Sequence, residues 1–363
     1  MEYGKSLLDG SLWSWAVEWG DSMLTRFTHC LKIYCPDFSF SNGGTIQSQN
    51  ENTVSCFDTI HNNLISTFID SNKPELASVL TSYKLLNSSN SNCFLNWFKT
   101  ERFLPTLTFS DVSFKNAILR RLVYKPMIDN SSSSSICFCT SANNPYYLRL
   151  RRNAFHFLSC PKMSSDTKIR HDSVSHLISI FANKFCPFVI VQKEFPLNST
   201  ISNSHSHKVD LQIIIPSSNF NDEIIYYIDV CMFNTGCPSN LVRNEDQLKD
   251  LFIKQENKKI AQYAHVGFAD DLRLVPFILD TCGNLGVRAT KFLRDLAYLC
   301  NPSFNFVDKF IRWFRDSLQF VINESLSNQA INYHSWIGSK LKEVEENFNS
   351  LSPIVRIDLL EFD

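Results

Sequence analysis

The sequence predicts an α/β fold in which a mixed central sheet is flanked by helices, with a helical region before it and a helical tail after it. Two observations lead to this prediction. Residues 187–197, 208–216, 223–233 and 272–280 are short runs rich in isoleucine, valine and aromatic residues, as buried strands are. Longer segments around these runs carry apolar residues at helical spacing. The predicted order of elements is α-β-β-β-α-β-α.

The helices of this core are expected at residues 167–185, 247–268 and 288–300. The first of them places apolar residues from Val174 to Phe181 on one face, which is the pattern of a helix that packs against a sheet. A change of period from helical to alternating at residue 187 supports the boundary between this helix and the first strand.

Polar linkers divide the rest of the chain. Apolar periodicity predicts further helices at 6–34, 56–86 and 109–126 upstream, and at 305–325 and 335–351 downstream. The serine run 131–135 reads as a flexible joint. The chain is therefore expected to have four parts: a helical linker region at 1–130, a cysteine- and histidine-bearing segment at 131–165, the α/β domain at 166–300 and a C-terminal helical extension at 301–363.

The net charge of about −1 excludes a global positive field that would attract nucleic acid, so any phosphate binding must come from a local patch. One such patch exists between residues 145 and 171, where basic residues outnumber a single acid, Asp166. The basic residues of this segment are Arg149, Arg151, Arg152, Lys162, Lys168 and Arg170.

Cysteine usage and the N-terminus bear on location. Twelve cysteines lack the regular spacing of a secreted disulfide scaffold, and the first residues are acidic and aromatic where a signal peptide would be basic and then apolar. No run of about 18 apolar residues suggests a membrane span. These features predict a chain with reduced thiols in the nucleus or the cytoplasm, neither secreted nor bound to a membrane.

Two aspartates lie within the second and third predicted strands. Asp210 comes early in one strand and Asp229 late in the next. If the strands pair antiparallel, the two positions can lie side by side. In a restriction-endonuclease-like PD-(D/E)xK core, adjacent strands bring two carboxylates together in this way to hold Mg²⁺ or Mn²⁺, which activates a water for phosphodiester hydrolysis.

Such cores usually carry a lysine two residues after the second acid, but Cys231 occupies that position here. Lys258 and Lys259 on the following helix are the candidate replacements. Lys259 and Tyr263 are one helical turn apart and therefore share a face. Glu194, on the first strand, is a candidate third acid. A purely structural interpretation stays open, because acids at strand ends are common and lysines on helices are usually solvated.

The segment "CFCTSANNPYYLRLRRNAFHFLSCP" offers Cys137, Cys139, His156 and Cys160. Three thiolates and an imidazole form a standard tetrahedral zinc set. The His-x₃-Cys pair has good ligand spacing, whereas Cys-x-Cys is one residue tighter than usual. The alternative is that these are unligated cysteines beside a buried histidine.

Taken in order, these motifs resemble the C-terminal region of site-specific non-LTR retrotransposon proteins. "FKNAILRRLVYKP" is similar to the helix before that family's CCHC zinc knuckle, and "CFC…HFLSCP" to the knuckle itself. "TKIRHDSVSHLI" is similar to the segment that opens the family's nuclease. "KVD", "IDV" and "KKIAQY" resemble its paired aspartates and its displaced lysine with tyrosine. "FILDTCGNLGVRATKFL" looks like the strand-turn-helix that closes the fold. The likeness spans roughly residues 110–300.

The resemblance implies a restriction-like endonuclease at 166–300, preceded by a zinc knuckle at 131–165. Asp210 and Asp229 would hold Mg or Mn, Lys259 and Tyr263 would act beside them, and the four cysteine and histidine residues would bind zinc. Double-stranded DNA would be nicked to prime reverse transcription, with element RNA and a reverse transcriptase supplied elsewhere as further partners. The residues expected to contact nucleic acid are Arg149, Arg151, Arg152, Lys168, Arg170 and His171.

The sequence departs from that family in two further respects. Val209 stands where a proline is usual, and no reverse-transcriptase catalytic segment precedes the knuckle. The chain is therefore expected to be a fragment, a separately encoded piece or a domesticated remnant. Two alternatives to an active nuclease remain: a catalytically inactive nucleic-acid-binding remnant, and a helical interaction protein whose aromatic C-terminal stripe binds a partner.

Overall fold

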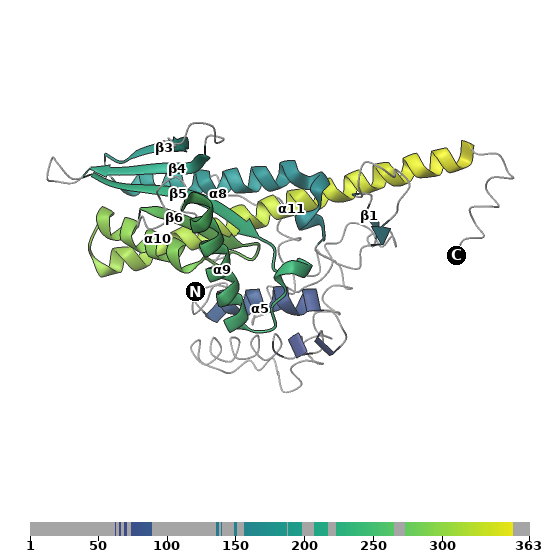
Figure 1. Cartoon of the computed structure of the whole chain (residues 1–363), viewed down its shortest axis with the longest axis horizontal. Helices are drawn as coiled ribbons and strands as arrows, with labels where there is room; N and C mark the ends of the chain where they lie inside the picture. The colour runs from purple at the N-terminus through teal and green to yellow at the C-terminus, as the bar shows by residue number, and fades with distance from the viewer. Residues whose placement is uncertain are drawn as a thin grey trace, which may run out of the picture.

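The computed structural model of the chain (Figure 1) describes residues 74–88, 156–186, 188–197, 207–216, 223–264 and 273–350, with short pieces at 62, 65–66, 69–70, 136–137, 139 and 149–150. The helices predicted at 6–34 and 109–126, and the serine run 131–135, lie outside the described residues. Among the described residues, no helix combines the length and apolar composition that crossing a bilayer would require.

A four-stranded mixed sheet forms the centre of the fold. The strands lie in the spatial order β3 (Ile190–Leu197), β4 (His207–Pro216), β5 (Glu223–Phe233) and β6 (Leu274–Asp280). The first three pair antiparallel, and β6 runs parallel to β5. The parallel pair needs a crossover connection, which α9 (Glu245–Tyr263) provides. The predicted α/β class and the order of its elements are confirmed.

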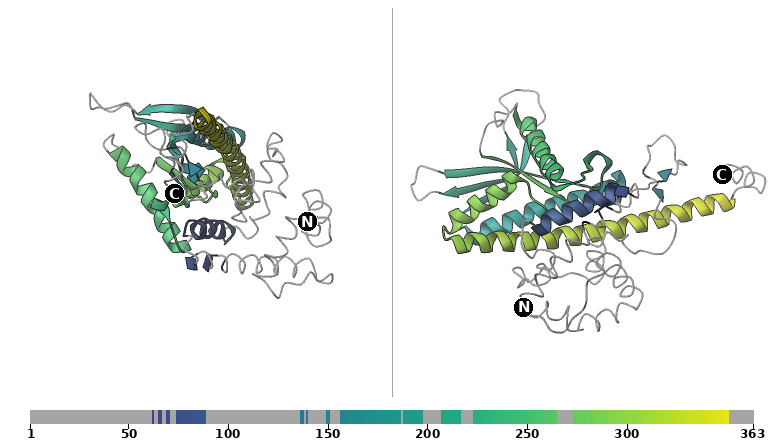
Figure 2. Two further views of the ribbon diagram at one scale, coloured as in Figure 1. Left: turned by 90° about the vertical axis from the view of Figure 1, so that its right-hand side faces the viewer. Right: turned by 90° about the horizontal axis from the view of Figure 1, so that it is seen from below.

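Helices cover both faces of the sheet (Figure 2). α9 packs on one face, where Leu248 and Phe252 meet Phe233 of β5. α8 (Ser164–Phe185), α10 (Val287–Cys300) and α11 (Phe304–Ser350) pack on the other. Leu211 and Ile213 of β4 point into that second core, so the alternation along the strand turns Gln212 toward the opposite face.

The C-terminal tail is one helix, α11, of 47 residues and thus about 70 Å long. The prediction of two helices was wrong because residues 326–334 contain no glycine or proline that would interrupt the helix. Its aromatic stripe is buried in the chain's own core: the ring of Phe181 on α8 lies edge-on to Phe310 and Phe314. The buried aromatic stripe is therefore not a surface that could bind a partner, as the interaction-protein hypothesis requires.

α5 (Pro74–Ser88) also belongs to this core, although it comes from the region expected to be a linker. The helix starts at Pro74, whose fixed φ suits the first turn. Its Ser82 hydroxyl donates to Asp280 at the end of β6. Asp280 also accepts from the backbone N–H groups of Cys282 at 2.8 Å and Asn284 at 3.0 Å. This buried carboxylate ties α5 to the turn after β6.

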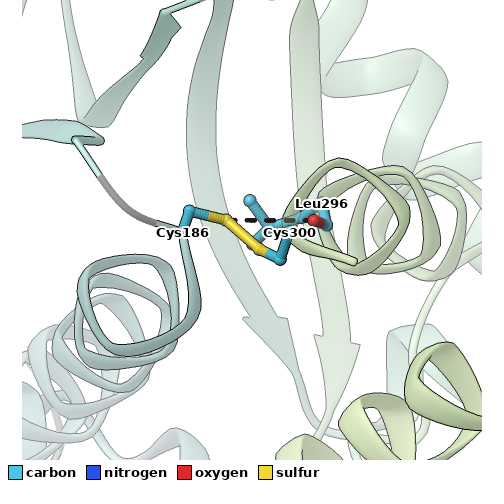
Figure 3. The surroundings of a disulfide bond; sticks show 3 residues. All are labelled: Cys186, Leu296 and Cys300. Carbon is cyan, nitrogen blue, oxygen red and sulfur yellow. Dashed lines mark hydrogen bonds between the residues drawn. A yellow bond between two sulfur atoms is a disulfide. The ribbon is translucent and has the colours of Figure 1, made fainter. Parts of the chain in front are cut away.

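A disulfide joins the C-terminal ends of α8 and α10, through Cys186 and Cys300 (Figure 3). The two residues are 114 positions apart in sequence, and their Cα atoms lie 4.8 Å apart. The expectation of reduced thiols therefore does not hold for this pair. No spacing rule could identify it, because the pairing depends on which helix ends meet in space.

Candidate functional site

The register of the central hairpin brings Asp210 and Asp229 together. β4 and β5 pair from Pro216↔Glu223 to Leu211↔Ile228. Asp210 and Asp229 are the next residues beyond this last pair. Oδ2 of Asp210 accepts from the N–H of Val230, the residue after Asp229, at 2.6 Å, and the charge of Asp210 acts on Asp229. The aspartates that the sequence singled out are therefore neighbours in the sheet.

Asp229 is buried and paired with a lysine from α9. The Lys259 ammonium lies 2.9 Å from Oδ2 of Asp229. Tyr263, one turn later on α9, donates from its hydroxyl to the backbone carbonyl of Lys208 at 3.1 Å. The predicted displaced lysine and its tyrosine thus lie on the same side of the sheet as the second aspartate, while Cys231 packs beside α9.

The protonation of this group follows from its surroundings. Burial raises the pKa of Asp229, Lys259 lowers it by charge and by hydrogen bonding, and the nearby charge of Asp210 raises it again. Burial disfavours the charged form of Lys259, but Asp229, with smaller contributions from Cys231 and Asp210, raises the lysine pKa overall. Burial and Asp229 also raise the pKa of Tyr263. The tyrosine is therefore a neutral hydrogen-bond donor at neutral pH.

Contacts at both ends of α9 fix where Lys259 lies. Asn244 caps the first turn by accepting from the Gln247 N–H at 2.9 Å. Near the other end, buried Glu256 accepts from the N–H of Arg288 at 2.9 Å, at the start of α10. This carboxylate passes so close to Gly286 that a Cβ added there would lie 2.4 Å from its Oε1. Lys259 follows Glu256 by three residues, so the anchor orients the face that carries it.

Asp210 is held from the opposite helix layer, by His171 of α8. The Nε2 atom of His171 lies 3.2 Å from Oδ2 of Asp210 and 3.1 Å from the carbonyl oxygen of Val230. The same Oδ2 accepts from the Val230 N–H at 2.6 Å. The Nδ1 atom of His171 lies 3.1 Å from Asp172. His171 was expected to contact nucleic acid, and the structure shows that it contacts Asp210.

The charge of His171 follows from these neighbours. The hydrogen bond to Asp210 raises its pKa to about 9, against the opposing effect of burial, with further contributions from the charge of Asp210 and from Asp172. The imidazole is therefore charged at neutral pH. We call Asp210, Asp229, Lys259, Tyr263 and His171 the carboxylate site.

Glu194 is near the carboxylate site in register but its side chain is directed elsewhere. Lys193 pairs with Leu211 and Phe195 with Val209, so the position opposite Asp210 is Glu194. Its φ of 49° departs from strand geometry. The carboxylate lies 3.8 Å from Lys208 and its side chain is 77% exposed. In this conformation Glu194 is not a third acid of the site.

The basic residues predicted to bind nucleic acid differ in where the structure places them. Arg170 is only 3% exposed and its guanidinium donates to Gln329 of α11, so it cannot reach a phosphate, and that prediction was wrong. Lys168, on α8, is exposed. Arg149 lies in the two-residue strand β2 (Arg149–Leu150), where its side chain is not described. Arg151 and Arg152 lie outside the described residues.

A second group of potential ligands consists of Cys139, His156 and Cys160, which we call the Cys-His cluster. One ligand atom of each lies within 4.8 Å of the others, and Sγ of Cys139 is 3.2 Å from Nε2 of His156. Within the described ranges this is the one such set of three. Thiolates and an imidazole suit Zn²⁺. Cys137, the predicted fourth ligand, lies in strand β1 (Ile136–Cys137), but its side chain is not described.

Contacts to α11 hold the Cys-His cluster in place. His156 begins a 3₁₀ turn, η2 (His156–Ser159), and Cys160 follows it directly. The rings of His156 and Phe157 contact Tyr333 of α11, and Gln329 donates to the Phe157 carbonyl at 2.9 Å. Gln329 also accepts from Arg170, so the buried arginine links this segment to α8.

Comparisons of the chain with protein-family models, with curated proteins and with solved structures found no match.

Proposed function

We propose that this chain is a metal-dependent DNA endonuclease with a restriction-like PD-(D/E)xK core, of non-LTR retrotransposon origin. It would nick duplex DNA by phosphodiester hydrolysis and so prime reverse transcription. The observation that carries the proposal is the place of the two acids directly beyond the last β4–β5 pair, Leu211↔Ile228, with Asp210 bonded to the N–H of Val230 and Lys259 at 2.9 Å from Asp229.

The donor set suits a hard divalent cation. Asp210 and Asp229 offer carboxylate oxygens, which Mg²⁺ and Mn²⁺ prefer. Burial and the neighbouring carboxylate both disfavour the ionised form of Asp229, and Lys259 with a hydrogen bond from Tyr263 offsets this only in part. A cation shared by the two acids would stabilise the ionised form of Asp229 and reduce the repulsion between the two carboxylates. Bound there, Mg²⁺ or Mn²⁺ would supply an activated water and offset negative charge at the scissile phosphate.

The remaining side chains have roles that follow from their positions. Lys259 lies where its ammonium can stabilise charge on a phosphate oxygen next to Asp229. Tyr263 fixes the start of β4 through the Lys208 carbonyl and thereby the strand that carries Asp210. Lys208 and Lys258 are exposed on the strand and helix that flank the acids, so they are suited to contact the DNA backbone.

The Cys-His cluster would bind structural zinc, with Cys137 as the fourth ligand. Its thiolate and imidazole donors are of the kind that zinc selects. In this proposal the zinc-bound segment lies beside the nuclease and helps to position the DNA strand or the element RNA, while a reverse transcriptase supplied elsewhere extends the nicked end.

The proposal is tested by nicking of supercoiled plasmid DNA in Mg²⁺ or Mn²⁺. Wild-type protein should convert supercoiled plasmid to the open circle, and Asp229→Ala and Asp210→Ala should each lower the rate by at least about 100-fold, as loss of a key charge-stabilising group does. Asp250→Ala, at an exposed position of α9, is the matched control and should retain full activity. Equal rates for Asp229→Ala and wild type would exclude the assigned site.

An inactive nucleic-acid-binding remnant is the second candidate. It is favoured by Glu194, whose exposed carboxylate lies near Lys208 and not at the acids, and by the net charge of −1. This candidate predicts DNA binding that weakens with added salt, without cleavage in any divalent cation.

A further inference from the structure

Both hydrogen bonds that fix Asp210 converge on a single oxygen. Its Oδ2 accepts from the Val230 N–H at 2.6 Å and lies 3.2 Å from Nε2 of His171. Among the described residues, no hydrogen bond or ion pair of Oδ1 accompanies them. With Oδ2 held by two donors, Oδ1 is the oxygen that Asp210 can offer to another ligand.

The backbone bond explains why this carboxylate stands where it does. The β4–β5 ladder ends at Leu211↔Ile228. The next N–H of β5 to face β4, that of Val230, goes to the side chain of Asp210 and not to its backbone. The carboxylate thus occupies the point where the strands begin to separate, next to the residue that follows Asp229.

One backbone donor alone would leave the carboxylate able to rotate about its Cβ–Cγ bond. His171 supplies the second donor, and it reaches from α8, whose buried face is packed against the sheet and α11. The ring is fixed at three points, because Nε2 also contacts the Val230 carbonyl at 3.1 Å and Nδ1 contacts Asp172 at 3.1 Å. These contacts restrict the orientation of the ring and keep Nε2 directed at Asp210.

We propose that His171 is a positioning residue of the carboxylate site, which orients Asp210 so that Oδ1 faces the space shared with Asp229. This inference rests on the proposed function, because it assigns His171 to the binding of the divalent cation. It also replaces the expectation that His171 contacts nucleic acid: both of its ring nitrogens already meet protein acceptors.

The experiment measures Mn²⁺ affinity by electron paramagnetic resonance titration of the full chain, without DNA, with zinc present to saturate the Cys-His cluster. Asp229→Ala supplies the baseline. His171→Ala should weaken Mn²⁺ binding about 10- to 100-fold, as loss of a residue that orients a metal ligand does. His171→Gln, whose amide can still donate to Asp210, should recover part of this loss. His176→Ala, on an exposed position of the same helix, should bind as wild type does.

Duplex DNA binding in a buffer with zinc but without Mn²⁺ or Mg²⁺ separates the two roles of His171. If it positions Asp210, His171→Ala and wild type should bind DNA equally in that buffer, and excess Mn²⁺ should restore part of the variant's nicking rate. Unchanged Mn²⁺ affinity combined with weaker DNA binding would overturn the inference in favour of a phosphate contact.

Two further outcomes complete the test. Asp172→Asn removes the charge on the far side of the ring and should weaken Mn²⁺ binding by a few-fold, which tests the inference even if His171→Ala does not fold. If wild-type protein neither binds Mn²⁺ nor nicks DNA, the proposed function falls together with this inference. If wild type does both and the His171 variants match it, only the role of His171 is overturned.

Discussion

The carboxylate site and the Cys-His cluster each gather a few ligand-type side chains, but different kinds of backbone position them. Asp210 and Asp229 sit on paired strands, and Lys259 sits on a helix anchored at both ends. In the Cys-His cluster, His156 begins a 3₁₀ turn and Cys160 directly follows that turn. At the carboxylate site each acid already has a cationic partner, His171 or Lys259.

This difference indicates how each region would depend on metal. The sheet register holds the two acids together whether or not a cation is bound, and the local cations offset their charge. In the Cys-His cluster, the described part that carries His156 and Cys160 is a single 3₁₀ turn, so bound metal would contribute directly to folding there. Metal removal should therefore unfold or loosen one region and leave the backbone of the other in place.

The largest expected effect is at the Cys-His cluster. Cys160→Ser should reduce bound zinc from about one ion per chain toward zero. It should also lower the free energy of unfolding by about 4 kcal/mol or more, because a structural zinc site supplies on the order of 10 kcal/mol of folding free energy. Zinc content by mass spectrometry and urea unfolding measure the two quantities.

Cys282→Ser is the matched control for that change. Cys282 is as deeply buried as Cys160 but lies outside the cluster, after β6. It should cost only about 1–2 kcal/mol, the typical cost of burying an extra hydroxyl, and leave zinc content unchanged. Equal zinc content in the two serine variants would show that the cluster does not bind zinc.

At the carboxylate site, Lys259→Met should lower the free energy of unfolding by about 3 kcal/mol, because it leaves buried Asp229 without its cation. Adding Asp229→Asn should recover much of this loss, since the amide carries no charge. Lys258→Met, at an exposed position on the same helix, should change stability by less than about 0.5 kcal/mol. A Lys259→Met variant as stable as Lys258→Met would contradict a buried ion pair.

A smaller effect is expected at the anchor of α9. Gly286→Ala places a Cβ 2.4 Å from Oε1 of Glu256, so the contact between α9 and α10 must shift, at a cost of about 1–2 kcal/mol. Gly338→Ala meets nothing within 4 Å on helix α11 and should stabilise by up to about 1 kcal/mol. Thermal unfolding compares the two variants, and neither should alter zinc content. Destabilisation by both would argue against the steric explanation.

Local patterns in the sequence predicted most of the regular structure. Alternating and helical periods located β3 to β6 and α8 to α10 to within a few residues, because each element's pattern is set by its own repeat. The spacing of Lys259 and Tyr263 also placed them correctly on one helix face. The prediction that Asp210 and Asp229 could meet depended on an antiparallel hairpin, and the pairing of β4 with β5 confirms that hairpin.

The contacts of Arg170 and His171 could not be predicted from the local sequence. Both were assigned to nucleic acid as one basic motif. On a helix, adjacent residues point about 100° apart, so α8 turns Arg170 toward Gln329 in the interior and His171 toward Asp210. The motif named the residues, but the packing of α8 between the sheet and α11 decided what each one touches.

By itself, the sequence determined the class of the fold, the order of its elements and the candidate metal-binding side chains. These follow from short-range spacing and residue chemistry. Only the tertiary structure decided that α5 joins the core, that Cys186 pairs with Cys300 across 114 residues, and that His171 meets Asp210. Each of these depends on which faces of distant elements pack together, and that choice is made by the burial of the whole core and not by any local repeat.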